Sequence, residues 1–351
     1  MVDCSVSERT IGLDVGDRWS VACVVSREGA VVERFRVATR AEELSKRLSG
    51  ARARVVLEVG THSPWMSRLL EGLGHEVIVA NARRVRRISQ GENKSDEIDA
   101  ELLARLGRVD PNLLSPIRHR GERAQRDRMR IQSRDALVRT RTQLITTVRG
   151  LGKALGIRFP KCTTAAFARR VHEAFAEEPF PACRVLLAEI EHVTESIKGL
   201  EREIAEAAQR YPEVAKLEAV RGVGTLTALT FVLTLEDPQR FEKSRAVGPF
   251  LGLCPRRRQS GAQDPQLRIT KAGDPLLRRL LVQCANYILG PHGVDCDLRR
   301  YGERLIQRGG KAARKRALVA VARKLAVLLH HLWVHEAPYE PLHQAALAEA
   351  A

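Results

Sequence analysis

The first part of the chain consists of short apolar runs separated by polar turns, a pattern that is typical of buried β-strands. Three runs rich in β-branched residues, TIGLDVG, SVACVVS and AVVERFRV, lie between residues 10 and 37, and short Gly-Asp and Glu-Gly turns separate them. This pattern predicts three consecutive strands. After them we expect a helix at about 40–50 capped by Thr39, a strand at 53–59, a helix at 63–73, a strand at 76–80 and helices from about 81 onward.

Helical periodicity dominates the middle of the chain. Residues 118–155 contain arginines throughout and few helix breakers, and residues 182–210 repeat apolar side chains at helical spacing. The pattern predicts two long helices that pair as an antiparallel coiled-coil arm, and a helical hairpin within one chain accounts for it equally well. The apolar repeat consists of Leu186, Ile190, Val193, Ile197, Leu200 and Ile204.

A glycine-containing turn follows the predicted arm. The segment KLEAVRGVGTLTALTFVLTL has the helix-hairpin-helix pattern, with Gly222 and Gly224 between two apolar helices. Such a hairpin offers backbone N–H groups to DNA phosphates, although an ordinary turn between helices has the same pattern. We therefore expect an α/β N-terminal domain at 1–112, a helical coiled-coil arm at 113–212 and a mostly helical C-terminal domain at 213–351.

Four acidic residues occupy chemically informative places in this pattern. Asp14 lies in the first predicted strand and Glu58 ends the fourth, while Asp96 and Asp99 stand where a helix presents both on one face. Three strands, βαβ units and then an acid-bearing helix form the layout of a ribonuclease-H-like fold, which brings the four carboxylates together. Such carboxylates repel unless a cation lies between them, and hard oxygen ligands suit Mg²⁺ or Mn²⁺. Taken singly, each acid is also compatible with a turn or an ordinary helix start.

Charge is distributed unevenly along the chain. The 351 residues include 59 Lys or Arg and 42 Asp or Glu, which gives a net charge of +17. Residues 1–80 hold 11 basic and 11 acidic side chains, whereas residues 118–149 hold 10 Arg against three acids and residues 256–316 hold 15 basic residues against five acids. A neutral domain followed by two basic blocks favours a nucleic acid as partner. Aromatic residues are only 4% of the chain, so we expect phosphate contacts rather than base stacking to dominate binding.

A serine lies in a strongly basic loop. Ser260 stands beside a glycine and follows three consecutive arginines. A nucleophilic serine needs exposure, and nearby cations hold a phosphate and stabilise its transition state. On residue chemistry alone, a surface serine is the more common explanation. The basic residues around it are Arg256, Arg257, Arg258, Arg268 and Lys271.

The whole chain resembles the DEDD transposases of bacterial insertion sequences, the IS-one-ten family, which is related to the Piv-type DNA invertases. The resemblance lies in IGLDVG, VVLEVGTHSPW, KSDEIDAELLAR, VRGVGTLTA and GLCPRRRQSG…RITKAGDPLLRRLL, which occur in the family's order. It implies a RuvC-like metal site formed by Asp14, Glu58, Asp96 and Asp99. It also implies that Ser260 is the nucleophile that attacks DNA.

The resemblance also sets expectations for chemistry and partners. It implies transposition or site-specific recombination through Mg²⁺-dependent strand cleavage and transfer, with double-stranded DNA at the element ends and the target as substrate. The family is known for guide-RNA-directed recombination, so a noncoding RNA is an expected partner, as is a homo-oligomer, either a dimer or a tetramer. The sequence departs from the family at His62 and Trp65, where an aromatic such as tyrosine is expected.

Other functions explain fewer of these features. An actin-like or sugar-kinase-like ATPase shares IGLDVG, but the second glycine-rich Asp loop of that superfamily is not evident in the later half. A non-catalytic DNA-binding protein would leave the four acids unexplained. A RuvC-like junction nuclease without a covalent intermediate would leave the block around Ser260 unexplained.

Cysteines and histidines give no second metal site in the pattern. Seven scattered cysteines lack paired spacing, and we see no signal peptide, so we expect a reducing cytoplasm. No apolar run approaches the length of a membrane span in this reading, so we expect no membrane partner. His331 and His335 have the spacing of zinc ligands without a third ligand, and we expect them, with His330, to form a partly exposed helix face.

Overall fold

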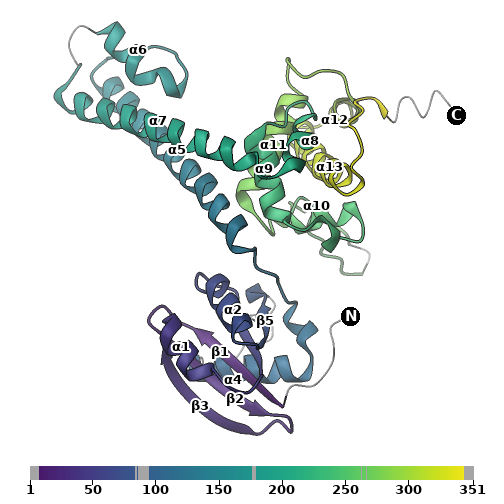
Figure 1. The fold of residues 1–351 in the computed structure, drawn as a ribbon. Coiled ribbons are helices and arrows are strands. Elements are labelled where there is room, and N and C mark those ends of the chain that lie inside the picture. The colour runs from purple at the N-terminus through teal and green to yellow at the C-terminus, as the bar shows by residue number, and fades with distance from the viewer. Residues whose placement is uncertain are drawn as a thin grey trace, which may run out of the picture. The chain divides into compact units, whose positions relative to one another are not determined.

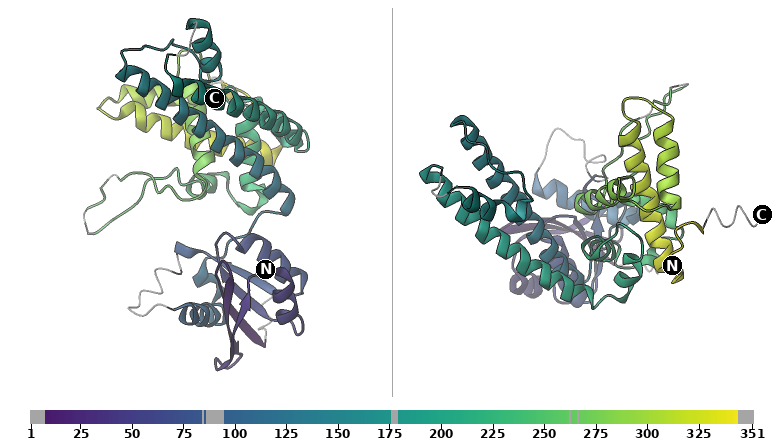
Figure 2. Two further views of the ribbon diagram at one scale, coloured as in Figure 1. Left: turned by 90° about the vertical axis from the view of Figure 1, so that its left-hand side faces the viewer. Right: turned by 90° about the horizontal axis from the view of Figure 1, so that it is seen from above.

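The chain folds into two compact units, Met1–Arg120 and Gly121–Ala351. Each unit has its own hydrophobic core, and the labelled elements can be followed in Figure 1 and Figure 2. The computed structural model describes residues 8–83, 85, 95–175, 179–261, 263–265 and 267–343.

A five-stranded mixed sheet forms the centre of the first unit. Its strand order is β3-β2-β1-β4-β5. The first three strands pair antiparallel with their sequence neighbours, whereas β4 runs parallel to both β1 and β5, because helices rather than tight turns connect the later strands. The strands are β1 Arg9–Val15, β2 Trp19–Ser26, β3 Val31–Ala38, β4 Arg54–Glu58 and β5 Glu76–Ala80.

Helices cover both faces of this sheet. Leu13 of β1 and Leu57 of β4, both at odd-numbered positions, are fully buried in one core with side chains of α1 and α2. Even-numbered residues such as Gly12 and Val56 face α4 on the other side, as the alternation of side chains along a strand requires. The helices are α1 Ala41–Leu48, α2 Ser63–Gly72 and α4 Asp96–Val109.

Small residues make the contact between α4 and β1. A Cβ atom at Gly12 would overlap the carbonyl oxygen of Ala100 and would crowd the amide nitrogen of Ala104. Both alanines are themselves fully buried. A side chain at Gly12 would therefore have to push the helix away from the sheet.

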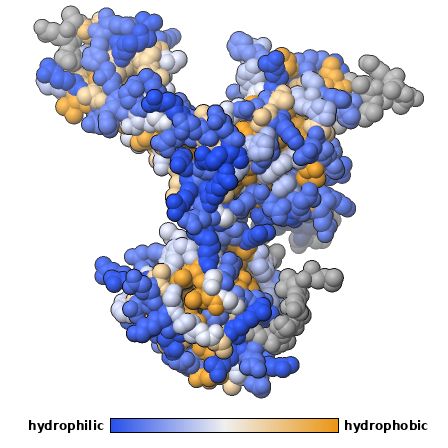
Figure 3. All heavy atoms as spheres, viewed as in Figure 1, coloured by the Kyte–Doolittle hydropathy of each residue, from blue (hydrophilic) through white to orange (hydrophobic). Residues whose placement is uncertain are grey.

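Two long antiparallel helices form an arm in the second unit. Arg130 pairs with Glu203, whereas Arg134, one turn later on α5, pairs with the earlier Glu201 on α7. Hydrophilic side chains dominate the surface of this helix pair in Figure 3. The acidic α7 thus neutralises part of the basic block on α5, and the pairing occurs within one chain. The helices are α5 Glu122–Ala154 and α7 Pro181–Ala208, with the short α6 Phe167–Ala174 between them.

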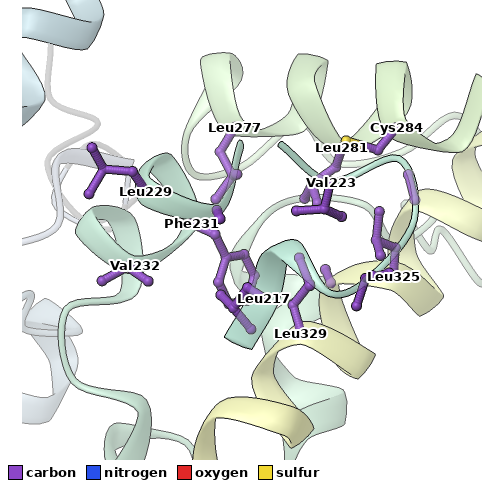
Figure 4. Close-up of a cluster of buried hydrophobic side chains, with 14 of the residues drawn as sticks. Leu217, Val223, Leu229, Phe231, Val232, Leu277, Leu281, Cys284, Leu325 and Leu329 are labelled. Atoms are coloured by element: carbon purple, nitrogen blue, oxygen red, sulfur yellow. The ribbon is translucent and has the colours of Figure 1, made fainter. Parts of the chain in front are cut away.

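The remaining helices form a bundle around one large apolar core. Figure 4 shows side chains from α8, α9, α11 and α13 converging there, including Leu217, Phe231, Leu281 and Leu325. All four of these side chains are fully buried. The helices are α8 Pro212–Glu218, α9 Thr225–Leu235, α10 Val247–Phe250, α11 Pro275–Ile288, α12 Asp297–Gln307 and α13 Ala313–His335.

α13 differs in two respects from what the sequence predicts. Of the helices in the described part of the chain, it alone is long and apolar enough to cross a membrane, and 44% of its apolar window is buried. α13 packs against α11 and α12, and its buried apolar residues therefore form part of the hydrophobic core. His330 on this helix is buried rather than partly exposed, because its ring bonds Ser244 Oγ and the Pro238 carbonyl at 2.9 Å each. Burial also lowers the pKa of His330.

The observed elements confirm an α/β N-terminal unit followed by a mostly helical remainder. Strand and helix boundaries in the first unit fall within a few residues of those predicted. The N-cap of α1 is an exception, because Arg40 and not Thr39 occupies that position. The Thr39 hydroxyl instead donates to the Gly16 carbonyl at 3.0 Å and lies 2.9 Å from the Ser20 hydroxyl.

We predict that Gly12→Ala destabilises the first unit by about 1–3 kcal/mol, because the added methyl group overlaps backbone atoms of α4 rather than a flexible side chain. Denaturant unfolding of the two proteins measures the difference. Gly72→Ala in α2 is the matched control, since open space surrounds Gly72 and alanine there should be neutral or stabilising by up to about 1 kcal/mol. Equal stability of Gly12→Ala and the wild type would contradict the close packing.

Candidate active site

Asp14 and Glu58 lie side by side where two central strands end. β1 and β4 are parallel neighbours whose paired register reaches Leu13 opposite Leu57, so the two acids occupy the next position. Both share the even parity of Gly12, which faces α4. Since side chains alternate along a strand, both carboxylates belong to the face that α4 covers.

α4 begins at the end of the sheet where these strands finish. Gly107, near the end of the helix, accepts a hydrogen bond of 3.0 Å from Arg54 at the start of β4. The middle of the helix lies over Gly12 of β1. The helix therefore runs antiparallel to β1 and β4, and its first turn lies toward Asp14 and Glu58.

The first turn of α4 supplies the other two acids. Ser95 caps the helix through its side-chain oxygen. Asp96 is exposed and Asp99 is half-buried, and they precede by one turn Ala100 and Leu103 of the face that packs on the sheet. The positive end of the helix dipole favours carboxylates at this position. The fold thus brings the backbone of all four predicted acids to the same end of the sheet.

The four acidic side chains lie at this end of the sheet but are not grouped as a complete metal-binding site. Across the ranges that the structure describes, no three His, Cys, Asp or Glu side chains are grouped closely enough to hold a metal ion. Asp14 and Asp99 each have an interaction partner. Mutual repulsion between carboxylates favours separated side chains. As donors, the four carboxylates have the oxygen chemistry that Mg²⁺ and Mn²⁺ prefer.

The structure shows contacts of His62, a histidine that lies near the acids. His62 Nε2 lies 3.1 Å from an Asp17 carboxylate oxygen, and Trp65 donates its indole N–H to His62 Nδ1 at 3.1 Å. Because Nδ1 accepts this bond, Nε2 carries the proton and donates to Asp17. Asp17 and His62 follow the strands that carry Asp14 and Glu58, and nothing in their sequence spacing indicated the contact.

Ser260 lies in the second unit near the tip of a loop whose two sides are joined by isolated β-bridges. Between the two sides, the Arg256 N–H donates to the Arg268 carbonyl at 2.9 Å. At the tip, the backbone N–H groups of Ser260 and Gln263 each bond the other residue's carbonyl, at 3.1 and 3.0 Å. Ser260 is exposed. In the left-hand view of Figure 2 this loop, in green, extends away from the helical bundle. The serine therefore has the exposure that a nucleophile requires.

The base of this loop is tightly held against the bundle. A Cβ atom at Gly252 would overlap backbone atoms of Ala272, and one at Gly273 would overlap the Phe250 carbonyl. Both glycines have positive φ angles, 69° and 67°, which other residues rarely adopt. Arg278 closes the base by donating through Nη1 to the carbonyls of Leu251, at 3.1 Å, and Ala272.

A buried ion pair connects this loop base to α5 of the arm. Arg128 on α5 pairs with Asp274, the N-cap residue of α11, and the two side chains are only 10% and 8% exposed. Arg128 also donates to the Thr234 hydroxyl at 3.2 Å. Because Asp274 follows Gly273 directly, the ion pair connects the arm to the start of the loop base.

The basic residues of this loop are exposed. Arg257 pairs with Asp264 at 3.5 Å, whereas Arg256, Arg258 and Arg268 have no carboxylate partner among the described residues. Lys271 lies at the base, exposed and with a φ angle of 55°. The loop thus carries a net positive charge to its exposed tip.

The predicted hairpin is a turn whose middle residue is anchored in the core. Val223 is 5% exposed and lies among Leu281, Cys284 and Leu325 in Figure 4. Gly224 on its far side is exposed with open space around it, and Gly222 has a φ angle of 92° and packs on Tyr287. A buried residue between two glycines therefore holds the backbone of the turn at the surface.

Comparisons with known proteins agree with this arrangement. A transposase family model for DEDD proteins of IS110 elements matches residues 11–155, and the model of the transposase IS116/IS110/IS902 family matches residues 214–293. The first match contains all four acids. The second contains the hairpin and the loop with Ser260.

Several relatives extend the similarity over most of the chain. A probable family 20 transposase of Pseudomonas aeruginosa is 29% identical over 295 residues, which are 82% of this chain and 86% of the relative. The transposase for insertion sequence element IS1111A of Coxiella burnetii is 28% identical over 344 residues, or 94% and 91% of the two chains. The transposase for insertion sequence element IS1328 of Yersinia enterocolitica is 31% identical over 237 residues, or 66% and 69%.

These features define a DNA-processing enzyme of the transposase class, with an acid-bearing α/β unit and a helical unit that presents a basic loop. The chain belongs to the IS110 family of DEDD transposases.

We predict that Arg278→Met loosens the loop base. Amide exchange of Thr270 and Lys271, which bond to the carbonyls of Cys254 and Gly252, should become about tenfold faster or more, because two charged hydrogen bonds are lost. Hydrogen-exchange mass spectrometry measures this.

Two further variants control for charge and position. Arg278→Lys should restore most of the protection, since one ammonium group can donate to both carbonyls. Arg279 lies on α11 next to Arg278 and forms a more exposed ion pair with Asp135 of α5. Arg279→Met should therefore leave exchange in the loop unchanged. Wild-type exchange rates in Arg278→Met would show that this arginine does not hold the loop.

Proposed function

We propose that this transposase cuts and joins DNA by divalent-metal-dependent phosphoryl transfer, with Ser260 as the nucleophile. The observation that carries the proposal is the convergence of four acids: Asp14 and Glu58 end adjacent strands, and α4 starts at the same end with Asp96 and Asp99. Such a group of carboxylates fits a metal-dependent nuclease better than a structural role, because its members repel one another.

We further propose that the first unit is a RuvC-like, ribonuclease-H-like domain. Its strand order β3-β2-β1-β4-β5, with three antiparallel strands followed by parallel ones, supports this. The placement of α4 across the even-numbered face supports it as well. An actin-like ATPase would not account for the basic loop of the second unit.

Asp14, Glu58, Asp96 and Asp99 are the residues that would hold Mg²⁺ or Mn²⁺. When bound, such ions supply positive charge that polarises the scissile phosphate and favours ionisation of the attacking hydroxyl. The chain's own contribution is to present hard oxygen donors on rigid elements, two at strand ends and two in the first turn of a capped helix.

Ser260 would attack the phosphorus of a DNA phosphodiester through its side-chain oxygen. The new bond between oxygen and phosphorus replaces the bond to the leaving strand. The serine proton is released and the leaving oxygen takes up a proton. The product is a phosphodiester between protein and DNA, which keeps the bond energy available for later strand joining. The exposed loop tip and its arginines support this role, since cations stabilise the transition-state charge.

The basic loop and the hairpin would hold the DNA backbone. Arg256, Arg258 and Arg268 are exposed cations on the same loop as Ser260, and Gly222 and Gly224 flank a turn whose backbone lies at the surface. Such contacts position DNA without reading its sequence. We propose, on the resemblance to guide-RNA-directed recombinases, that a noncoding RNA supplies sequence specificity and that the active form is a homo-oligomer.

The first functional prediction concerns the acids. Asp14→Asn and Asp99→Asn should each abolish strand cleavage in Mg²⁺ while DNA affinity stays close to that of the wild type, because metal-ligand charge is lost and the basic loop is intact. Cleavage of supercoiled DNA and a binding titration measure the two properties. Glu97→Gln is the matched control, since Glu97 is an exposed carboxylate in the same helical turn. Wild-type cleavage by Asp14→Asn would remove this residue from the site.

The second functional prediction concerns the nucleophile. Wild-type protein with Mg²⁺ and cognate DNA, plus guide RNA where one is required, should give a protein–DNA species that survives denaturation, and Ser260→Ala should give none while still binding DNA. Gln259→Ala, at the exposed neighbouring position, should keep the adduct. An adduct at full yield in Ser260→Ala would assign the nucleophile elsewhere. Hydrolysis without any wild-type adduct would favour a plain RuvC-like nuclease.

A further inference from the structure

A second basic surface lies at the turn between α12 and α13, apart in sequence from the loop with Ser260. It combines the last turn of α12, a pair of glycines and the first turn of α13. Six cations occur within thirteen residues of this segment, which we term the α12–α13 basic turn. They are Arg304, Arg308, Lys311, Arg314, Lys315 and Arg316.

All six of these side chains are exposed. In the portions of the chain covered by the structure, none of them forms an ion pair with a carboxylate. The arginines of α5 behave differently, since Arg130 and Arg134 pair with glutamates of α7. The charge of the α12–α13 basic turn is therefore not neutralised within the protein as that of α5 is.

The backbone of the turn keeps these charges close together. Gly309 and Gly310 have φ angles of 76° and 96°, which lets the chain reverse within a few residues. Gly309 N–H bonds the Ile306 carbonyl at 2.9 Å, and Ala313 N–H bonds the Gly310 carbonyl at 2.9 Å. Open space surrounds Gly309, so a ligand can approach the turn.

Grouping these cations carries an electrostatic cost in the free protein. Arg304 and Arg308 stand four residues apart at the end of α12, a spacing at which like charges repel each other. Arg314, Lys315 and Arg316 lie in the first turn of α13, where the helix dipole disfavours positive charge. A bound polyanion would remove both costs and release counterions.

We propose that the α12–α13 basic turn is a second nucleic-acid site that binds the phosphodiester backbone through Arg308, Lys311 and Arg314. It rests on the proposed function in that DNA or a guide RNA is the ligand, and it adds a contact surface that neither the acids nor the loop with Ser260 provides. The shared ligand chemistry is a run of phosphates. Duplex DNA and single-stranded RNA are the two sources to be distinguished.

The test is the salt dependence of binding by the full chain with both probes. The triple variant Arg308→Gln, Lys311→Gln, Arg314→Gln should lower the log–log slope by about 2.7 on duplex DNA, or by about 2.1 on single-stranded RNA, at about 0.9 or 0.7 per phosphate contact. On duplex DNA, the affinity loss between about 50 and about 200 mM salt should then be about 40-fold smaller than in the wild type.

A matched control removes the same charge elsewhere. Arg40→Gln, Lys46→Gln, Arg52→Gln changes three exposed cations of the first unit and should leave the slope unchanged. Single variants such as Lys311→Gln should each lower it by about 0.9 on DNA or about 0.7 on RNA, which keeps the test decisive should the triple variant fold poorly.

The outcomes separate this proposal from the proposed function. A lower slope on DNA or on RNA alone supports the site and names its ligand. An unchanged slope on both probes overturns the site, even where the wild type forms its Ser260 adduct. Loss of the adduct from the wild type would overturn the nucleophile, while a lower slope in the triple variant would still support the basic turn.

Discussion

The close packing of α4 on β1 is the constraint on which the first unit depends. Gly12 has no side chain, so the backbone around Ala100 and Ala104 can rest directly on the strand. Because the helix runs antiparallel to β1 and β4, this close packing holds its acidic first turn near the end of the sheet where both strands finish. The parallel register places Asp14 and Glu58 at that same end. One glycine and one strand pairing thus bring together acids that are far apart in the sequence.

The second unit presents the exposed loop of Ser260 on a base that is packed tightly against the helical bundle. Its apolar core lies under the hairpin and the bundle helices, while Ser260 stands at the loop tip. The loop base is held by two close backbone contacts and by Arg278. The buried pair of Arg128 with Asp274 adds a link to the arm. Removing one partner of such a pair is costly because it leaves an unpaired buried charge.

Local patterns predicted the strands and helices of the first unit to within a few residues, since apolar runs and helical spacing depend on neighbours in the sequence. The same patterns placed Asp14 and Glu58 on strands and Asp96 with Asp99 on a helix, and whether these acids bind metal stays a prediction. What the sequence could not provide were contacts between distant residues. Thr39 had the chemistry of a helix cap, but Gly16 lies within reach of its hydroxyl. His330 was expected at the surface, yet the chain around Pro238 covers it.

Direct metal binding tests the central claim most closely. A Mn²⁺ titration of the full chain, followed by the electron paramagnetic resonance signal of free Mn²⁺, reports binding without any DNA or catalysis. We expect saturable binding by the wild type that is lost in Asp14→Asn and in Asp99→Asn, but kept in Glu97→Gln. Binding that survives both aspartate substitutions unchanged, or no saturable binding at all, would contradict the claim that these carboxylates form the metal site of this transposase.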